Sequence, residues 1–150
     1  MNIQRVKQGA RITYANGIYM MFLGLFLIFF DNMNMKTNFT AINQLWGFFS
    51  KFNAEIASLF ILFHILIGTL LFSSGIIFLY LSDYIIKRKE KMTWVMLFII
   101  GIIDWVALLI VAVVLGNTIL IVLTAIGWAM FIFGMLLPIN YYLQKSYREY

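Results

Sequence analysis

The chain has 150 residues, of which 63% are hydrophobic and 11% are charged, whereas a soluble domain has about 25% charged residues. A domain of this length cannot hide so much apolar surface from water, so the composition excludes a soluble fold and predicts an integral membrane protein. The net charge of +5 comes from basic residues beside apolar stretches, where they contact lipid headgroups, so we expect no nucleic-acid binding.

A short basic tail, residues 1–11, precedes the first apolar stretch, which we expect to cross the membrane over residues 13–30. A basic start followed by apolar residues is also typical of a secretory signal. This stretch ends without the small residues of a cleavage site, so we interpret it as a retained span. Asn16 lies near the expected beginning of the span, and we predict that it sits at the membrane interface.

The segment 31–55 is the longest predicted loop, and its second half has a helical pattern. Apolar and aromatic residues recur there at every third or fourth position, at Phe39, Ile42, Leu45, Trp46, Phe49, Phe52 and Ile56. The pattern is typical of an amphipathic helix that lies in the headgroup layer outside the bundle. A cap that packs on the bundle and has no role in lipid contact fits the pattern equally well.

Three further apolar stretches follow, over residues 57–81, 94–115 and 118–137. Each is long enough to cross a hydrocarbon core of about 30 Å as a helix. A polar turn over residues 83–92 and a tight Gly116-Asn117 turn connect them, and Pro138 marks the end of the last one. Short turns make neighbouring helices antiparallel, so we predict an all-α fold: one transmembrane four-helix antiparallel bundle over residues 1–150.

Glycine spacing indicates how the spans pack. Pairs of glycines seven residues apart occur in three spans, as Gly17 and Gly24, Gly68 and Gly75, and Gly127 and Gly134. Small residues at this interval let two helices approach along one seam. We therefore expect these glycines to be packing positions with no chemical role.

Basic residues predict the orientation. Nine of the eleven Lys and Arg residues lie in the N-terminal tail, the 83–92 turn and the C-terminal tail. Because positive residues favour the cytoplasmic side, we expect a cell-membrane protein with both termini in the cytoplasm. The expected partners are the lipid bilayer and either other membrane subunits or further copies of the chain.

Asp104 is the candidate functional residue, because it lies near the middle of the third apolar stretch. A charged carboxylate at that depth costs at least ~2.5–3.5 kcal/mol. It is either neutral or paired in the bundle interior. Matching depths along the spans gives Trp128 and Thr124 as donors, and places His64 about one turn farther out, where contact with Asp104 needs helix tilt or a bridging water.

Two interpretations of these polar residues remain open. Asp104 either fixes helix packing through an interhelical hydrogen bond, or it is a ligand or proton site that forms a titratable pair with His64. For His64 alone, a satisfied interior histidine is the more typical case.

Catalytic and metal-binding patterns are missing from the sequence. There is no cysteine and only one histidine, and the chain contains no HExxH, GxSxG or P-loop motif. We therefore expect no metal and no cofactor, and we lean towards a protein that is not an enzyme.

One set of residues carries a resemblance. The segments LWGFF at 45–49, NAEIA at 53–57 and KRKEKMTW at 87–94, together with Gly68 and Gly75, resemble small four-span prokaryotic membrane proteins that are distantly similar to the DoxX-like family. The resemblance covers about residues 40–100 of the chain. It implies a four-helix membrane bundle and, through the DoxX-like family, an association with quinone-linked redox partners.

Three functions fit these observations. The first is a non-enzymatic accessory or assembly subunit, including a self-associating bundle. The second is a small proton-coupled carrier or channel in which Asp104 titrates. The third is a quinone- or lipid-binding subunit of a membrane redox system, with Trp105 and Trp128 as the wall of its pocket.

Overall fold

The computed structural model describes residues 2–41 and 46–148, and within these ranges the chain is helical and has no strand. Four long helices are α1 (Asn2–Phe29), α4 (Ala54–Arg88), α5 (Lys91–Val114) and α6 (Thr118–Leu136); three short ones are α2 (Asp31–Ala41), α3 (Trp46–Phe52) and α7 (Ile139–Arg148). The predicted all-α helical bundle is confirmed. Among the described residues, these four long helices are long and apolar enough to cross a membrane.

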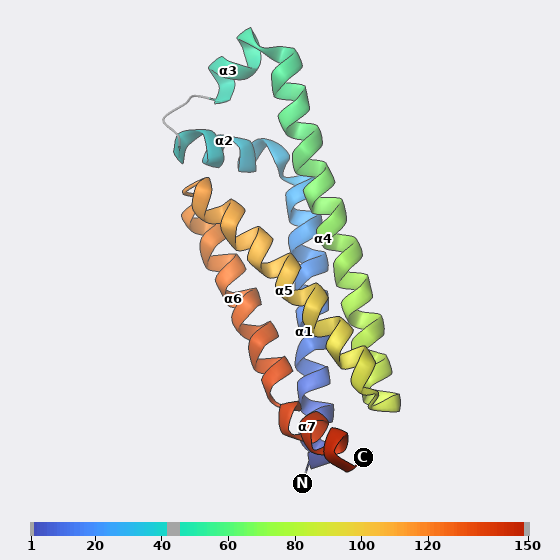
Figure 1. The fold of residues 1–150 in the computed structure, drawn as a ribbon. Helices are drawn as coiled ribbons and strands as arrows, with labels where there is room; N and C mark the ends of the chain where they lie inside the picture. Colours follow the sequence, from blue (N-terminus) through green and yellow to red (C-terminus); the bar gives the residue numbers. More distant parts are fainter. Residues whose placement is uncertain (1, 42–45, 149–150) are drawn as a thin grey trace.

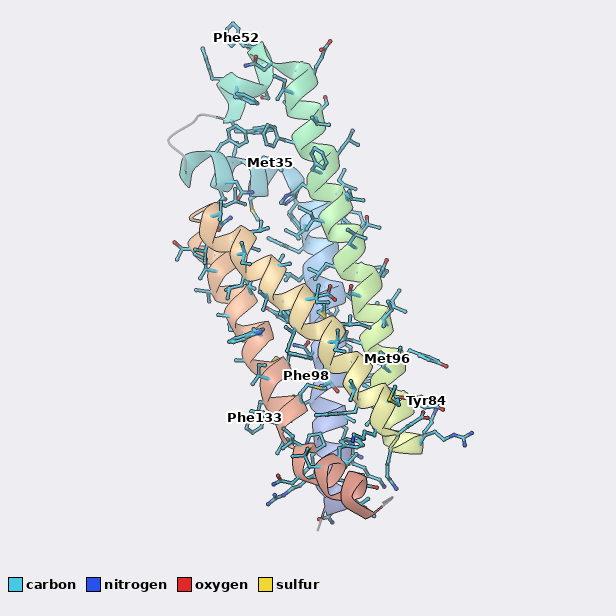
Figure 2. The ribbon with its side chains drawn as sticks, in the orientation of Figure 1. Met35, Phe52, Tyr84, Met96, Phe98 and Phe133 are labelled. Atoms are coloured by element: carbon cyan, nitrogen blue, oxygen red, sulfur yellow. The ribbon has the colours of Figure 1, made fainter. Side chains whose placement is uncertain are left out.

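The long helices form a ring in which each neighbour runs antiparallel (Figure 1). Helix α1 packs against α4 and α6, and α5 closes the ring between α4 and α6. Both ends of the chain lie at one end of the bundle, which we call the terminal end. Helices α2 and α3 lie at the opposite end, which we call the cap end, and α2 runs across it. Large apolar side chains such as Phe133, Ile103 and Leu62 are exposed, and a lipid phase would cover them. Figure 2 shows Phe133 on the outer side of α6.

Helix α1 is longer than predicted, because it begins at Asn2. The prediction that residues 1–11 form a tail outside the bundle is wrong for the described residues: Val6 and Ala10 belong to the buried core. The sequence gives little indication of this burial, because polar residues separate the few apolar positions of the first 11 residues. Gly9 also packs into the bundle, since a Cβ placed there would lie 2.5 Å from the Gly134 carbonyl oxygen.

Both predicted turns are present, and the turn between α4 and α5 is shorter than predicted. Helix α4 has 35 residues, about 50 Å of helix, and it absorbs most of the predicted 83–92 turn. Only Lys89 and Glu90 remain between α4 and α5, with Lys89 in the left-handed region at φ 52°. Gly116 also has a positive φ, 63°, and Asn117 caps α6 by accepting the Leu120 N–H at 3.1 Å.

The C-terminal segment, expected to be a tail, forms helix α7 after the end of α6 at Leu136, just before Pro138. Tyr142 on α7 is buried, and its ring stacks on Trp94 of α5 with centroids 5.1 Å apart. Burial, with a smaller contribution from the neighbouring Tyr141, raises the pKa of Tyr142. The helix therefore closes the terminal end of the bundle against α5.

Glycines bring α1 and α4 into backbone contact. A Cβ on Gly24 would lie 2.6 Å from the Gly68 carbonyl oxygen, and a Cβ on Gly17 would lie 2.9 Å from that of Gly75. Each seven-residue step on α1 thus meets a seven-residue step on α4 in the reverse direction. Gly134 of α6 packs in the same manner on α1, where its Cβ would lie 2.9 Å from the Thr13 methyl group.

The predicted interfacial helix is divided among α2, α3 and the first turn of α4, and two of its residues, Ile42 and Leu45, lie outside the described residues. Phe39 and Trp46 are buried against each other, with ring centroids 4.7 Å apart, and pack with Phe49 and Ala57. We call these four residues the cap cluster. They support the interpretation as a cap, while Phe48 and Phe52 nearby are exposed.

Candidate functional site

Asn16 is the centre of a buried hydrogen-bond network near the middle of the bundle. Its Nδ2 donates to the carbonyl oxygen of Gly127 on α6 at 2.8 Å, and its Oδ1 accepts from Nε1 of Trp105 on α5 at 3.1 Å. The Trp105 ring fills the space that a Cβ on Gly127 would need. The Tyr19 ring stacks on Trp105, and its hydroxyl donates to the Leu123 carbonyl oxygen at 2.9 Å.

This network has a structural role. Asn16 is fully buried, so the prediction of an interfacial Asn16 is wrong; the longer α1 moves the residue to the helix midpoint. Its amide oxygen and amide nitrogen each have a partner, and buried polar networks of this kind specify one arrangement of helices. Trp105 is part of the network and is not among the residues that line the spaces described below.

Asp104, the next residue on α5, points in a different direction. It is half-buried and lines a groove of about 200 Å³ between α4 and α5, together with Ser74, Leu70, Ile103 and Ala107. The Ser74 side chain is hydrogen-bonded to the carboxyl group. Oxygen Oδ2 is buried and has no hydrogen-bond partner among the described residues.

The structure does not bring the predicted polar residues into one site. The Thr124 hydroxyl donates to the Leu120 carbonyl oxygen of its own helix at 2.7 Å, so it is not a donor to Asp104. Trp128 is 37% exposed on α6. His64 lies farther towards the cap end, where it lines a separate cavity. The sequence predicted how far along its helix each polar residue lies, but not the direction in which its side chain points.

The largest of these spaces lies beneath α2 at the cap end, and we call it the cap cavity. It has a volume of about 410 Å³ and is lined by Met35, Asn38, Phe39, Phe49, Phe60, Phe63, His64, Ile67 and Leu115. A smaller space of about 80 Å³ shares Asn38 and His64 with it and continues towards Asn117. Cavities of a few hundred Å³ with apolar walls and few polar groups are typical small-molecule sites.

Polar groups are concentrated at one side of the cap cavity. Nδ2 of Asn117 donates to Oδ1 of Asn38 at 2.7 Å and ties α2 to the α5–α6 turn. Because the described bonds of Asn38 use only its oxygen, its Nδ2 group can donate to a ligand. His64 of α4 is buried at 9% exposure beside it. The wall is otherwise apolar, with Phe60 and Phe63 reaching the exposed side of α4.

Sequence reasoning named His64 as a candidate but missed Asn38 and the aromatic residues as parts of one cavity. Asn38 and Asn117 lie 79 positions apart in the sequence, and the phenylalanines have the spacing of lipid-facing residues. Only the return of α2 across the cap end brings them together. In the described part of the chain no three His, Asp or Glu residues are grouped to hold a metal ion.

Comparisons with known proteins add no further constraint. No family model, curated protein or solved structure matches the chain.

Proposed function

We propose that this chain is a multi-pass membrane protein that binds a quinone-class amphiphile in the cap cavity, as a non-enzymatic binding subunit of a membrane redox system. The observation that carries the proposal is the chemistry of the cavity. Aromatic side chains line a space of about 410 Å³, and Asn38 and His64 supply polar contacts.

A quinone matches this combination better than a plain hydrocarbon chain does. Its planar ring is suited to the rings of Phe49, Phe60 and Phe63. Its carbonyl oxygens accept hydrogen bonds, and Nδ2 of Asn38 is a donor at the cavity wall. An isoprenoid tail can leave between the exposed phenylalanines of α4 towards the lipid. An acyl chain offers no hydrogen-bond acceptor to Nδ2 of Asn38.

The proposal includes an orientation. Nine of the eleven basic residues lie outside the predicted loop between the first two spans and the Gly116-Asn117 turn, which favours cytoplasmic termini in the cell membrane. Both termini lie at the same end of the bundle. The cap cavity then opens in the half of the membrane that faces away from the cytoplasm.

A quinone-linked role is also what the sequence resemblance of residues 40–100 implies, through small four-span proteins that are distantly similar to the DoxX-like family. The alternative of an accessory subunit that binds no ligand does not account for the cap cavity. The alternative of a carrier requires Asp104 on the transport path, and Asp104 lies in a different groove from His64.

Equilibrium binding of a short-tailed benzoquinone to the detergent-purified protein tests the proposal. Asn38→Leu and His64→Leu each remove a polar contact, and loss of a hydrogen bond of about 0.5–1.5 kcal/mol weakens binding by roughly twofold to tenfold. Leu115→Trp fills the cavity and should abolish saturable binding.

The matched control is Ser73→Ala, because Ser73 is exposed on the same helix and bonds only to its own backbone at Thr69. The control should bind as the unaltered chain does. Uptake that rises linearly with quinone concentration, or equal binding in all of these variants, would contradict the proposal.

A further inference from the structure

Asn16 and Asp104 lie at similar depth in the bundle but differ in their hydrogen-bond partners. Asn16 has partners from two other helices for both ends of its amide. Asp104 has only Ser74, and its Oδ2 stays buried without a partner among the described residues. If Asp104 served packing alone, an interior arrangement such as that of Asn16 would satisfy it. The Asp104 side chain instead lines a space.

That space is the groove between α4 and α5. Figure 1 shows α5 close to α4 near their common turn and leaning away from it towards α2. The groove has a volume of about 200 Å³, and its flanking residues Leu70 and Ile103 are largely exposed on the side of the bundle. A ligand can therefore enter it sideways from a lipid phase, without passing through either end of the protein.

The residues around the groove define the ligand. Seven apolar side chains line it with Ser74 and Asp104: Ile67, Leu70, Leu71, Ile103, Ala107, Leu108 and Val111. None of them is basic, so the lining gives the carboxylate no counter-ion. None is aromatic, so a cation held here would be recognised by the carboxylate and not by an aromatic face.

We propose that the α4–α5 groove is a binding site for a small lipophilic organic cation, such as an alkyl quaternary ammonium, with Asp104 as its counter-ion. The positive centre pairs with the Asp104 carboxylate, and the alkyl groups replace lipid against Leu70 and Ile103. Ser74 holds the carboxyl group in place. The site is separate from the cap cavity and does not depend on the proposed quinone function.

Binding of hexyltrimethylammonium to the full chain in lipid nanodiscs tests this site. The unaltered protein should bind one equivalent in a saturable manner, as measured by isothermal titration calorimetry. Its uncharged analogue of the same shape, with carbon in place of nitrogen, should not saturate. Asp104→Asn keeps the shape of the side chain but loses the charge, and should weaken binding at least tenfold.

Two further variants keep the test decisive. Asp83→Asn is the matched control, because Asp83 is an exposed carboxylate of α4 that pairs with Lys87 at 2.6 Å, and it should bind normally. Ala107→Phe leaves Asp104 intact but fills the groove, so it should also abolish binding and covers the case in which Asp104→Asn does not fold. Equal affinity in Asp104→Asn or Ala107→Phe, or no saturable binding to the unaltered protein, would overturn the proposal.

Discussion

Replacing Gly24 with alanine tests the helix seam that holds the bundle together. The new methyl group would lie 2.6 Å from the Gly68 carbonyl oxygen and 2.8 Å from the Phe72 backbone nitrogen. Both are backbone atoms, so the contact is relieved only if α1 and α4 move apart. Overpacking of this kind costs about 1–3 kcal/mol, against a gain of roughly 1 kcal/mol from the helix propensity of alanine.

Gly47→Ala is the matched control, because a Cβ at Gly47 of α3 meets nothing within 4 Å. The control keeps the propensity gain and lacks the clash, so Gly24→Ala should be less stable than Gly47→Ala by about 1–3 kcal/mol. For a chain of this size that difference corresponds to roughly 2–12 °C in the unfolding midpoint. Thermal unfolding in detergent, followed by circular dichroism, measures it. Equal midpoints for the two variants would refute the close backbone contact.

The remaining predictions concern three polar side chains. Asn16→Leu leaves the Trp105 indole N–H without an acceptor in the bundle interior and should lower the free energy of unfolding by about 1–3 kcal/mol. The control Thr69→Ala removes an exposed hydrogen bond within one helix and should change that free energy by less than about 0.5 kcal/mol. Equal effects of the two variants would contradict the network. Asn117→Ala removes the cap of α6 and the bond to Asn38, so it should cost about 0.5–2 kcal/mol and speed proteolysis of α2. Tyr142 has a raised pKa in the folded state. Its contribution to stability is therefore constant below the ordinary tyrosine pKa of about 10 and falls above it, because the unfolded chain ionises first. Tyr142→Phe should reduce this loss of stability at alkaline pH in a pH series of unfolding midpoints, and an unchanged series would count against burial of the hydroxyl.

The sequence was sufficient for the helices but not for the directions of their side chains. Long apolar runs, the Gly116-Asn117 turn and Pro138 predict the bundle, because each of these signals is local. Successive residues of a helix point about 100° apart around its axis. An error of one residue in the predicted rotation of α5 therefore places Asp104 in the bundle interior, where Trp105 lies, instead of in the groove beside Ser74. Matching residues by depth alone therefore gave wrong hydrogen-bond donors for Asp104.

The cap cavity could not be predicted because it is made by non-local contacts. The pattern from Phe39 to Ile56 indicates a helix with an aromatic face but does not say where that helix turns back. The contact of Asn38 with Asn117 joins residues 79 positions apart. Asn16 was misplaced at the interface because polar residues in the first 11 positions concealed the true start of α1.

The central claim is a bundle that crosses the membrane with the cap cavity on the side opposite the termini. The chain has no cysteine, so single cysteines can be introduced at Phe52, on the exposed cap end, and at Glu90, in the turn at the terminal end. Labelling of intact cells with a membrane-impermeant maleimide should modify Phe52→Cys at once and Glu90→Cys only after lysis. Modification of both positions in intact cells, or the reverse order, would contradict the account.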